Sequence, residues 1–179
     1  MGEVRRIAKP FFPWVGGKLF LLPYIFQLLP RRAPRLLEVC GGSGAVTLGL
    51  GAGYAPLRVY NDVDVDLVNL FRCARDRPLA LLRELDFLPL HARADFEVVL
   101  RFLSLLRRAS DALQGVVVEN KDCCDVVRQY VRTGAVIYAD PPYLEAERMY
   151  APSFALRDHV RLHDCLCAPA ARDSHIVLS

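Results

Sequence analysis

The sequence lacks any long uninterrupted apolar run. Its 179 residues are 53% hydrophobic and 24% charged, which suits one globular domain with a sizeable core. No stretch approaches the roughly 18 to 20 apolar residues that a membrane-spanning helix needs. The N-terminal stretch MGEVRRIAKP also lacks the apolar centre of a secretory signal. We therefore expect a cytoplasmic protein with no membrane partner.

Paired metal ligands are also missing. The six cysteines form no C-x-x-C pair, and the sequence has only four histidines. Structural zinc sites usually repeat such paired ligands, so we expect no metal site. We interpret the cysteines as small buried side chains in a reducing compartment. They are Cys40, Cys73, Cys123, Cys124, Cys165 and Cys167.

Acidic residues are scarce near the N-terminus. Residues 1–35 hold seven basic residues and a single acid, Glu3. The basic residues are Arg5, Arg6, Lys9, Lys18, Arg31, Arg32 and Arg35. Residues 72–108 form a second arginine-rich stretch, which acids dilute. A solvated basic face is the simpler interpretation, but such a surface is also compatible with phosphate binding.

Strand-like and helix-like segments alternate along the chain, which is typical of an α/β sheet with crossover helices. Short apolar runs predict strands within 35–42, 57–64, 115–122, 135–143 and 175–179. Apolar spacing predicts helices within 43–54, 65–76, 79–114 with a break near Pro89, 124–131 and 155–171. We expect one domain over residues 1–179. Because the last predicted strand ends on the final residue, we expect this domain to lack further C-terminal strands.

A cluster of glycines follows the first predicted strand, in EVCGGSGAV. Gly41, Gly42 and Gly44 stand where the strand turns into a helix. Such a turn lets the backbone approach a ligand, and the helix N-terminus offers free N–H groups. A simple tight turn explains these glycines equally well. The loop does not match the P-loop pattern, which disfavours a nucleoside triphosphatase.

Acidic residues end three of the predicted strands. Asp62 lies about twenty residues after the glycine loop, where nucleotide-binding α/β folds place an acid on the ribose hydroxyls. Asp122 is placed to accept a hydrogen bond from an adenine amino group. Asp140 would lie beside the glycine loop if the fourth strand neighbours the first. We interpret Asp64, Asp66 and Asp125 as helix-start residues.

The fourth predicted strand ends in the tetrapeptide Asp140-Pro141-Pro142-Tyr143. Proline has no N–H, so this turn leaves a carboxylate and main-chain carbonyls as acceptors without internal partners. Such acceptors suit an amino group. Tyr143 offers a flat face for a planar base, and stacking of this kind contributes roughly 1 to 3 kcal/mol per base.

Five segments together resemble Dam-type DNA adenine-N6 methyltransferases. They are PFFPWVGGKLFLLPYI (10–25), LEVCGGSGAVTL (37–48), VYNDVDVDLVNLF (59–71), VENKD (118–122) and YADPPYL (138–144). The resemblance implies a Rossmann-like, S-adenosylmethionine-dependent methyltransferase sheet with flanking helices. It also implies site-specific methylation of adenine in double-stranded DNA, as in restriction–modification.

The resemblance assigns cofactor-binding roles by position. Trp14 and Lys18 would contact the methionine end of S-adenosylmethionine, with the lysine facing its carboxylate. The three glycines would line the cofactor, and Cys40 would lie beside its ring, where the family usually has phenylalanine. Asp62 would hold the ribose and Asp122 the adenine ring region, and Asp140 would lie between the cofactor and the target base.

The same resemblance makes Asp140, Pro141, Pro142 and Tyr143 the catalytic residues. Hydrogen bonds to the Asp140 carboxylate and the Pro141 carbonyl would concentrate the lone pair of the adenine amino nitrogen. Methyl transfer would then need mainly positioning of the two reacting atoms, about 3 to 3.5 Å apart. The target base would be flipped out of the duplex.

Several alternatives stay open. The predicted helical recognition insertion, about 72–114, is short for the family, which leaves room for a catalytically inactive remnant that binds DNA or cofactor. A cytosine-N4 methyltransferase usually has serine at the position of Asp140, and a glutamine-modifying protein methyltransferase usually has asparagine. Asp140 therefore argues against both enzymes. RNA is a possible substrate. The recognition sequence and the oligomeric state do not follow from the sequence.

Overall fold

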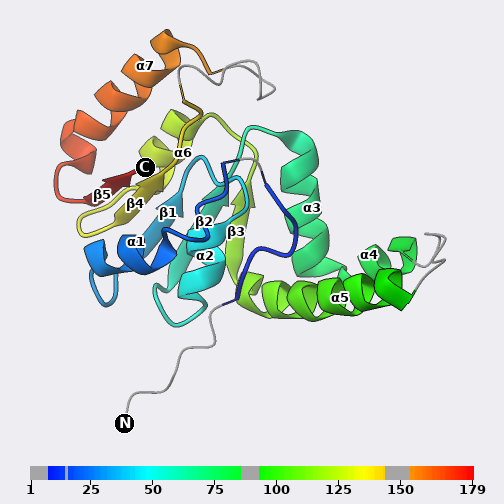
Figure 1. Ribbon diagram of the computed structural model, residues 1–179. Coiled ribbons are helices and arrows are strands. Elements are labelled where there is room, and N and C mark those ends of the chain that lie inside the picture. Colours follow the sequence, from blue (N-terminus) through cyan, green and yellow to red (C-terminus); the bar gives the residue numbers. More distant parts are fainter. Residues whose placement is uncertain (1–7, 15, 86–92, 144–153) are drawn as a thin grey trace.

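A five-stranded parallel sheet lies at the centre of the protein, with helices on both faces (Figure 1). The structure, a computed structural model, describes residues 8–14, 16–85, 93–143 and 154–179. The strands are β1 (Arg35–Glu38), β2 (Leu57–Asn61), β3 (Val116–Glu119), β4 (Val136–Ala139) and β5 (His175–Leu178). Each lies within a predicted strand, so the predicted α/β class is confirmed.

The strand order is β3-β2-β1-β4-β5. The central strand β1 pairs in parallel with β2 on one side and β4 on the other. In this register Glu38 is level with both Tyr60 and Tyr138. The condition that the fourth strand neighbours the first is therefore met, and the carboxyl ends of β1, β2 and β4 share one edge. Ligands of open α/β sheets bind at this edge, where the strand order reverses.

The helices are α1 (Leu22–Leu28), α2 (Ala45–Leu50), α3 (Val65–Asp76), α4 (Pro78–Leu85), α5 (Arg93–Leu113), α6 (Cys123–Tyr130) and α7 (Leu156–Cys167), and a short 3₁₀ helix, η2 (Pro169–Ala171), follows α7. Helix α4 packs on α3 and α5 and lies away from the sheet (Figure 1). Helix α1 was not predicted. Among the described residues, no helix has both the length and the apolarity needed to cross a membrane.

Alternate strand residues serve two separate cores, as the two-residue period of a strand requires. Leu37 and Ile137 point to one face and pack with α6 and α7. Leu36 and Val136 point to the other face and pack with α1 and α2. Tyr60 lies on this second face too, beneath α3 and α5. Both faces are apolar, so the strand ends are held rigidly between two helical layers.

The helix ends mostly follow their local signals. Asp64 caps α3, because its side chain accepts hydrogen bonds from the N–H groups of Asp66 and Leu67, as predicted. The helix predicted within 43–54 is confined to Ala45–Leu50, since Gly51 adopts a φ of 65° and ends it. The predicted break near Pro89 lies outside the described residues, with α4 and α5 on either side.

Candidate active site

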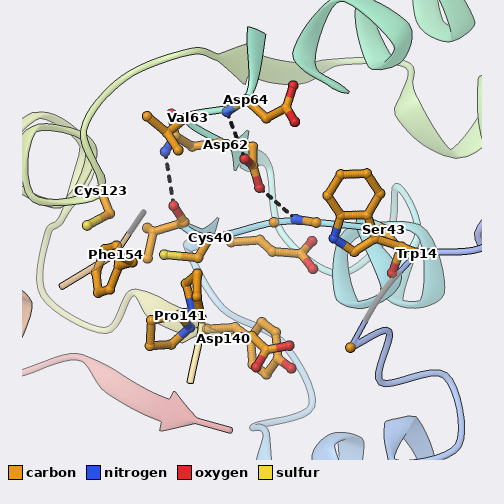
Figure 2. Close-up of a pocket in the computed structure, with 18 of the residues that line it drawn as sticks. Trp14, Cys40, Ser43, Asp62, Val63, Asp64, Cys123, Asp140, Pro141 and Phe154 are labelled. Atoms are coloured by element: carbon orange, nitrogen blue, oxygen red, sulfur yellow. Dashed lines mark hydrogen bonds between the residues drawn. The ribbon is translucent and has the colours of Figure 1, made fainter. Parts of the chain in front are cut away.

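A cavity of about 410 Å³ opens at the carboxyl edge of the sheet (Figure 2). Its volume lies in the usual range for small-molecule sites. Its lining includes eleven of the predicted site residues: Trp14, Lys18, Cys40, Gly41, Gly42, Asp62, Asp122, Asp140, Pro141, Pro142 and Tyr143. Of the predicted set, Gly44 alone is not among the lining residues. The topology thus gathers segments that are up to 129 positions apart.

The glycine loop is pressed against aromatic rings. A Cβ on Gly41 would lie 2.2 Å from the ring of Tyr60, and one on Gly42 would lie 2.9 Å from the indole nitrogen of Trp14. Gly42 also has a positive φ of 48°. No side chain fits at either position, so the loop backbone itself forms the cavity wall.

Gly44 has a packing role. It precedes α2 with a φ of 65°, and a Cβ there would lie 2.7 Å from the ring of Phe71. Phe71 stacks on Tyr60 with ring centroids 4.0 Å apart. The predicted contact between Gly44 and the cofactor stays a prediction, while the structure explains this glycine by its aromatic neighbour.

Asp62 is tied to the glycine loop. One carboxylate oxygen accepts from the Gly42 N–H at 2.8 Å, and the other accepts from the Asp64 N–H at 3.0 Å. Burial raises the pKa of Asp62, and these backbone donors counteract part of the rise. The side chain is therefore oriented before any ligand arrives, and each oxygen has a further lone pair for a hydroxyl group.

Lys18 pairs with Asp140. Its ammonium lies 2.8 and 2.9 Å from the two carboxylate oxygens and 4.8 Å from the centre of the Tyr143 ring. Lys18 is only 8% exposed. Burial acts to lower its pKa, but Asp140 and Tyr143 outweigh burial and raise it, so the lysine stays charged. The resemblance placed Lys18 against the cofactor carboxylate; here it also holds the proposed catalytic carboxylate in place.

Asp122 is less free than predicted. One of its oxygens accepts from the Cys124 N–H at 2.9 Å and caps α6, and the other pairs with Arg161 at 2.5 Å. The predicted role, acceptance of a hydrogen bond from an adenine amino group, stays a prediction. For this role, the Asp122 oxygen that pairs with Arg161 would also have to accept from the adenine, or the ion pair with Arg161 would have to break.

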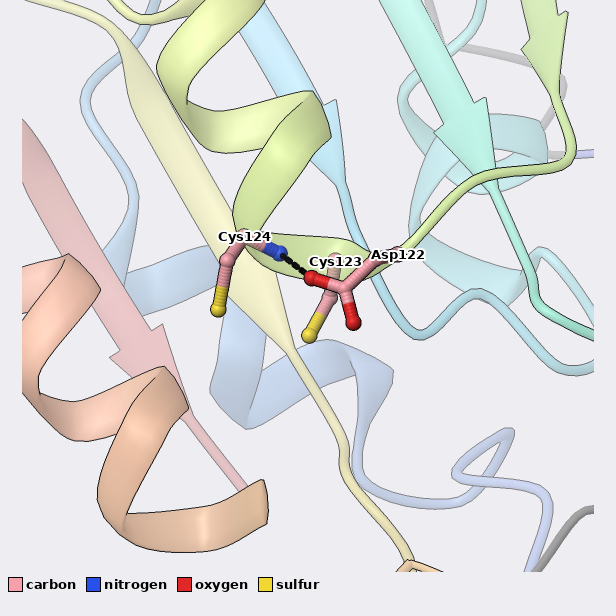
Figure 3. Close-up of side chains that lie close together, drawn as sticks. All are labelled: Asp122, Cys123 and Cys124. Carbon is pink, nitrogen blue, oxygen red and sulfur yellow. Dashed lines mark hydrogen bonds between the residues drawn. The ribbon is translucent and has the colours of Figure 1, made fainter.

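The start of α6 also brings three potential metal ligands together (Figure 3). The ligand atoms of Asp122, Cys123 and Cys124 lie within 4.8 Å of one another. The carboxylate is engaged by the cap and by Arg161, and the Cys124 thiol donates to the Arg161 carbonyl at 3.6 Å. These contacts account for the cluster as a helix start packed against α7, and the predicted absence of a metal stays a prediction.

Sequence reasoning missed the contribution of α7. Phe154, Arg157, Asp158 and Arg161 all line the cavity, either in α7 or just before it. The sequence places Asp158 and His159 near the start of the helix predicted within 155–171, but nothing in the sequence indicates that this helix reaches the site. The ion pair between Arg161 and Asp122 joins α7 to α6 beside the cavity.

Glu38 was also missed. It ends β1, lines the cavity and is only 1% exposed. Its two oxygens accept from the N–H groups of Val46 at 3.2 Å and Thr47 at 2.7 Å, at the start of α2. Burial raises the pKa of Glu38 to about 7; the two N–H donors oppose this rise and the charge of Asp140 adds to it. Glu38 therefore holds the start of α2 in place, and its contribution to the stability of the fold depends on pH.

We expect Glu38 to make stability fall as pH rises. Its folded-state pKa lies above its usual value of 4.5, so between about pH 4.5 and 7 the unfolded chain loses a proton that the folded protein keeps. The free energy of unfolding should fall by up to about 3 kcal/mol across this window. Urea unfolding of Glu38→Gln should show a much flatter pH dependence. Glu97→Gln, on the exposed surface of α5, should keep the wild-type slope; an unchanged slope in Glu38→Gln would contradict the assignment.

The sheet order, the glycine loop at the switch point and the shared carboxyl edge define a Rossmann-like α/β fold, which is consistent with a methyltransferase. Residues 14–98 match the family model described as D12 class N6 adenine-specific DNA methyltransferase. The matched segment carries Trp14, Lys18, the glycine loop and Asp62, and it ends before β3. Over this segment the chain is similar to the D12 class, which confirms the resemblance for the segments before β3.

Two of the curated proteins that are similar to this chain match it over part of its length. The type II methyltransferase M1.LlaDCHI of Lactococcus lactis subsp. cremoris is 36% identical over 74 residues, which is 41% of this chain and 25% of the relative. The DNA N-6-adenine-methyltransferase of Escherichia phage P1 is 41% identical over 67 residues, 37% of this chain and 8% of the relative. The chain thus matches a quarter or less of the length of these two relatives.

Proposed function

We propose that this protein transfers a methyl group from S-adenosylmethionine to the N6 amino group of adenine in double-stranded DNA. The observation that carries the proposal is the pairing of β1 with β4, which brings the Asp140-Pro141-Pro142-Tyr143 turn and the glycine loop to one cavity. The name of the Escherichia phage P1 relative and the description of the matched family both give DNA as the substrate and N6 of adenine as the position, which supports the proposal. This chain matches only part of the length of these relatives, so adenine methylation by this chain itself is proposed here.

The residues around the glycine loop suit S-adenosylmethionine. Gly41 and Gly42 border the cavity with their backbone, because Tyr60 and Trp14 leave no space for side chains there. Asp62 is pre-oriented to accept hydrogen bonds from ribose hydroxyls, and Trp14 borders the loop. We propose Trp14, Lys18, Cys40, Gly41, Gly42, Asp62 and Asp122 as the cofactor contacts. The sulfonium of the bound cofactor would supply the methyl group.

The Asp140 turn would activate the amino group. An adenine amino nitrogen is a poor nucleophile because its lone pair is delocalised into the ring. The carboxylate of Asp140 and the carbonyl of Pro141 would accept its two hydrogens and favour a localised lone pair. Lys18 fixes the carboxylate through both oxygens, and each oxygen keeps a lone pair for the amino group. This activation needs positioning rather than a covalent enzyme intermediate.

Tyr143 would receive the flipped base. Its side chain is 51% exposed at the cavity, and Lys18 lies against its ring. The unstacking of a base from a duplex costs a few kcal/mol, and stacking on the tyrosine would offset part of this cost. The exposed ring thus suits an extrahelical base better than a base within a duplex.

The basic surface would hold the phosphates. Lys9, Arg101 and Arg107 are exposed, whereas Arg5 and Arg6 lie outside the described residues. Neutralised phosphates release counterions, so the affinity for duplex DNA should fall steeply with salt. Fluorescence anisotropy between 50 and 200 mM salt should show at least about a tenfold loss. Arg101→Ala with Arg107→Ala should reduce the slope, and an affinity that ignores salt would contradict a phosphate-binding surface.

The decisive experiment is a transfer assay with S-adenosylmethionine labelled in its methyl group. We expect label in duplex DNA and, after digestion to nucleosides, N6-methyladenine as the product. N4-methylcytosine would overturn the choice of base, and label in RNA alone would overturn the choice of nucleic acid. Cofactor binding without any incorporation would indicate the inactive remnant. With DNA as substrate, we propose a cytoplasmic location, which recovery of the protein in the membrane fraction would contradict.

A further inference from the structure

Two cysteines that line the cavity have thiols close enough to interact. Cys40 follows β1 and leads into the glycine loop, and Cys123 is the first residue of α6. Both line the cavity, and Figure 2 shows both sulfur atoms in the space beside Phe154. The proposed transfer uses neither thiol as a reacting group, and Cys40 enters it only as a cofactor contact. Cys40 also stands where the resembled family usually has phenylalanine, so this pair is a feature of this chain's own sequence.

The two thiols interact, and this interaction shifts their pKa values in opposite directions. The contact with Cys123, together with burial, raises the pKa of Cys40. The contact with Cys40 lowers the pKa of Cys123 even though Cys123 is buried. Cys123 also begins an eight-residue helix, and helix N-termini favour thiolates. Cys123 is therefore the nucleophile of the pair, and Cys40 is the neighbouring thiol that can react next.

We propose that Cys40 and Cys123 form an oxidation-sensitive dithiol, which a peroxide converts into a disulfide that weakens cofactor binding. The Cys123 thiolate attacks the peroxide oxygen and becomes a sulfenic acid. The Cys40 thiol then attacks this sulfur and displaces water. For hydrogen peroxide the sum is two thiols and one peroxide giving one disulfide and two waters. The oxidation of the two thiols does not depend on the proposed methyl transfer. The expected effect on cofactor binding rests on the proposed function.

The disulfide would act through the glycine loop. An S–S bond is about 2.0 Å long and fixes the two Cβ atoms about 3.5 to 4.5 Å apart. The bond would join the start of the loop to the start of α6, next to Asp122. The loop has no room to yield toward the sheet, because Gly41 already lies against Tyr60. A bond at Cys40 therefore shifts the backbone at the cofactor side of the cavity.

The remaining four cysteines comprise a competing buried pair and two cysteines that the test removes. Cys124 and Cys165 lie together between α6 and α7, where the Cys165 thiol is 3.7 Å from the Cys124 carbonyl. Both are buried and outside the cavity lining, and burial raises the pKa of each. Cys73 and Cys167 lie outside the cavity lining as well, and Cys167 is exposed. Reaction limited to Cys123 and Cys40 therefore distinguishes the proposal from general oxidation.

The test uses the full chain carrying Cys73→Ser and Cys167→Ser, treated with hydrogen peroxide and digested without reduction. Mass spectrometry should find the peptides of Cys40 and Cys123 cross-linked. Calorimetry should show the affinity for S-adenosylmethionine lowered at least tenfold and restored by dithiothreitol. The Cys123→Ala variant should keep its own affinity after peroxide treatment.

Several outcomes would overturn the proposal. A disulfide between Cys124 and Cys165, or oxidation of Cys123 without a link to Cys40, would refute the dithiol. A Cys40–Cys123 disulfide that leaves the affinity unchanged would refute the effect on binding. Failure of the reduced protein to bind S-adenosylmethionine would refute the proposed function instead, and the peptide map would still decide the chemistry of the pair.

Discussion

Replacement of Asp140 by alanine should lower methyl transfer to adenine at least about a hundredfold, within the range typical for loss of a positioned acid–base group. Two effects combine. The amino group loses its carboxylate acceptor, and Lys18 loses the partner that holds its ammonium at 2.8 Å inside the cavity. Asp140→Asn should be nearly as impaired, because its amide offers only one acceptor oxygen and directs a donor toward the amino group or the lysine.

Single-turnover transfer rates with saturating DNA would measure this loss. Asp111→Ala removes the same charge from an exposed position at the end of α5 and should retain wild-type rates. Thermal unfolding of both variants would separate a lost reaction from a lost fold. Retention of more than a tenth of the wild-type rate by folded Asp140→Ala would exclude the carboxylate from catalysis.

Replacement of Gly41 by alanine should destabilise the protein by about 3 kcal/mol or more, at the upper end of what overpacking usually costs. The added methyl group would lie 2.2 Å from Tyr60, which is fully buried and stacked on Phe71. The tyrosine cannot swing away, because its hydroxyl also donates to the Gly42 carbonyl at 2.8 Å. The loop must move instead, so binding of S-adenosylmethionine should fall with stability.

Urea unfolding gives the measurement for Gly41→Ala. The control is Gly53→Ala, because a Cβ on Gly53 meets nothing within 4 Å and its φ is not in the left-handed region. This control should change stability by less than about 1 kcal/mol. Equal effects of the two substitutions would show that Tyr60 does not confine the loop.

The sequence predicted the parts of the site that arise from local patterns. Apolar runs and their polar ends located all five strands, and the glycines located the turn after β1. The pairing of β4 with β1 was a condition in the sequence argument, and the structure meets it. These features were accessible because each depends on neighbours within a few residues or on the general rule for parallel sheets.

The contacts that the sequence did not predict join distant segments. Lys18 meets Asp140, and Arg161 meets Asp122, through side-chain geometry that no spacing encodes. Glu38 was passed over because an acid at the end of a strand looks exposed until its helix is in place. Helix α1 was missed because Pro23 and flanking prolines obscured a short helix that has proline in its first turn.

The ion pair between Lys18 and Asp140 also bears on how the protein folds. It closes a chain segment 122 positions long, and contacts of such high sequence separation form only after the entropy of loop closure has been met. The cavity is therefore completed late, after β1 and β4 have paired. In refolding experiments, the ability to bind cofactor should return with the slowest major phase and not with early helix formation. Cofactor binding during refolding would therefore indicate that β1 and β4 have paired and that the cavity has formed.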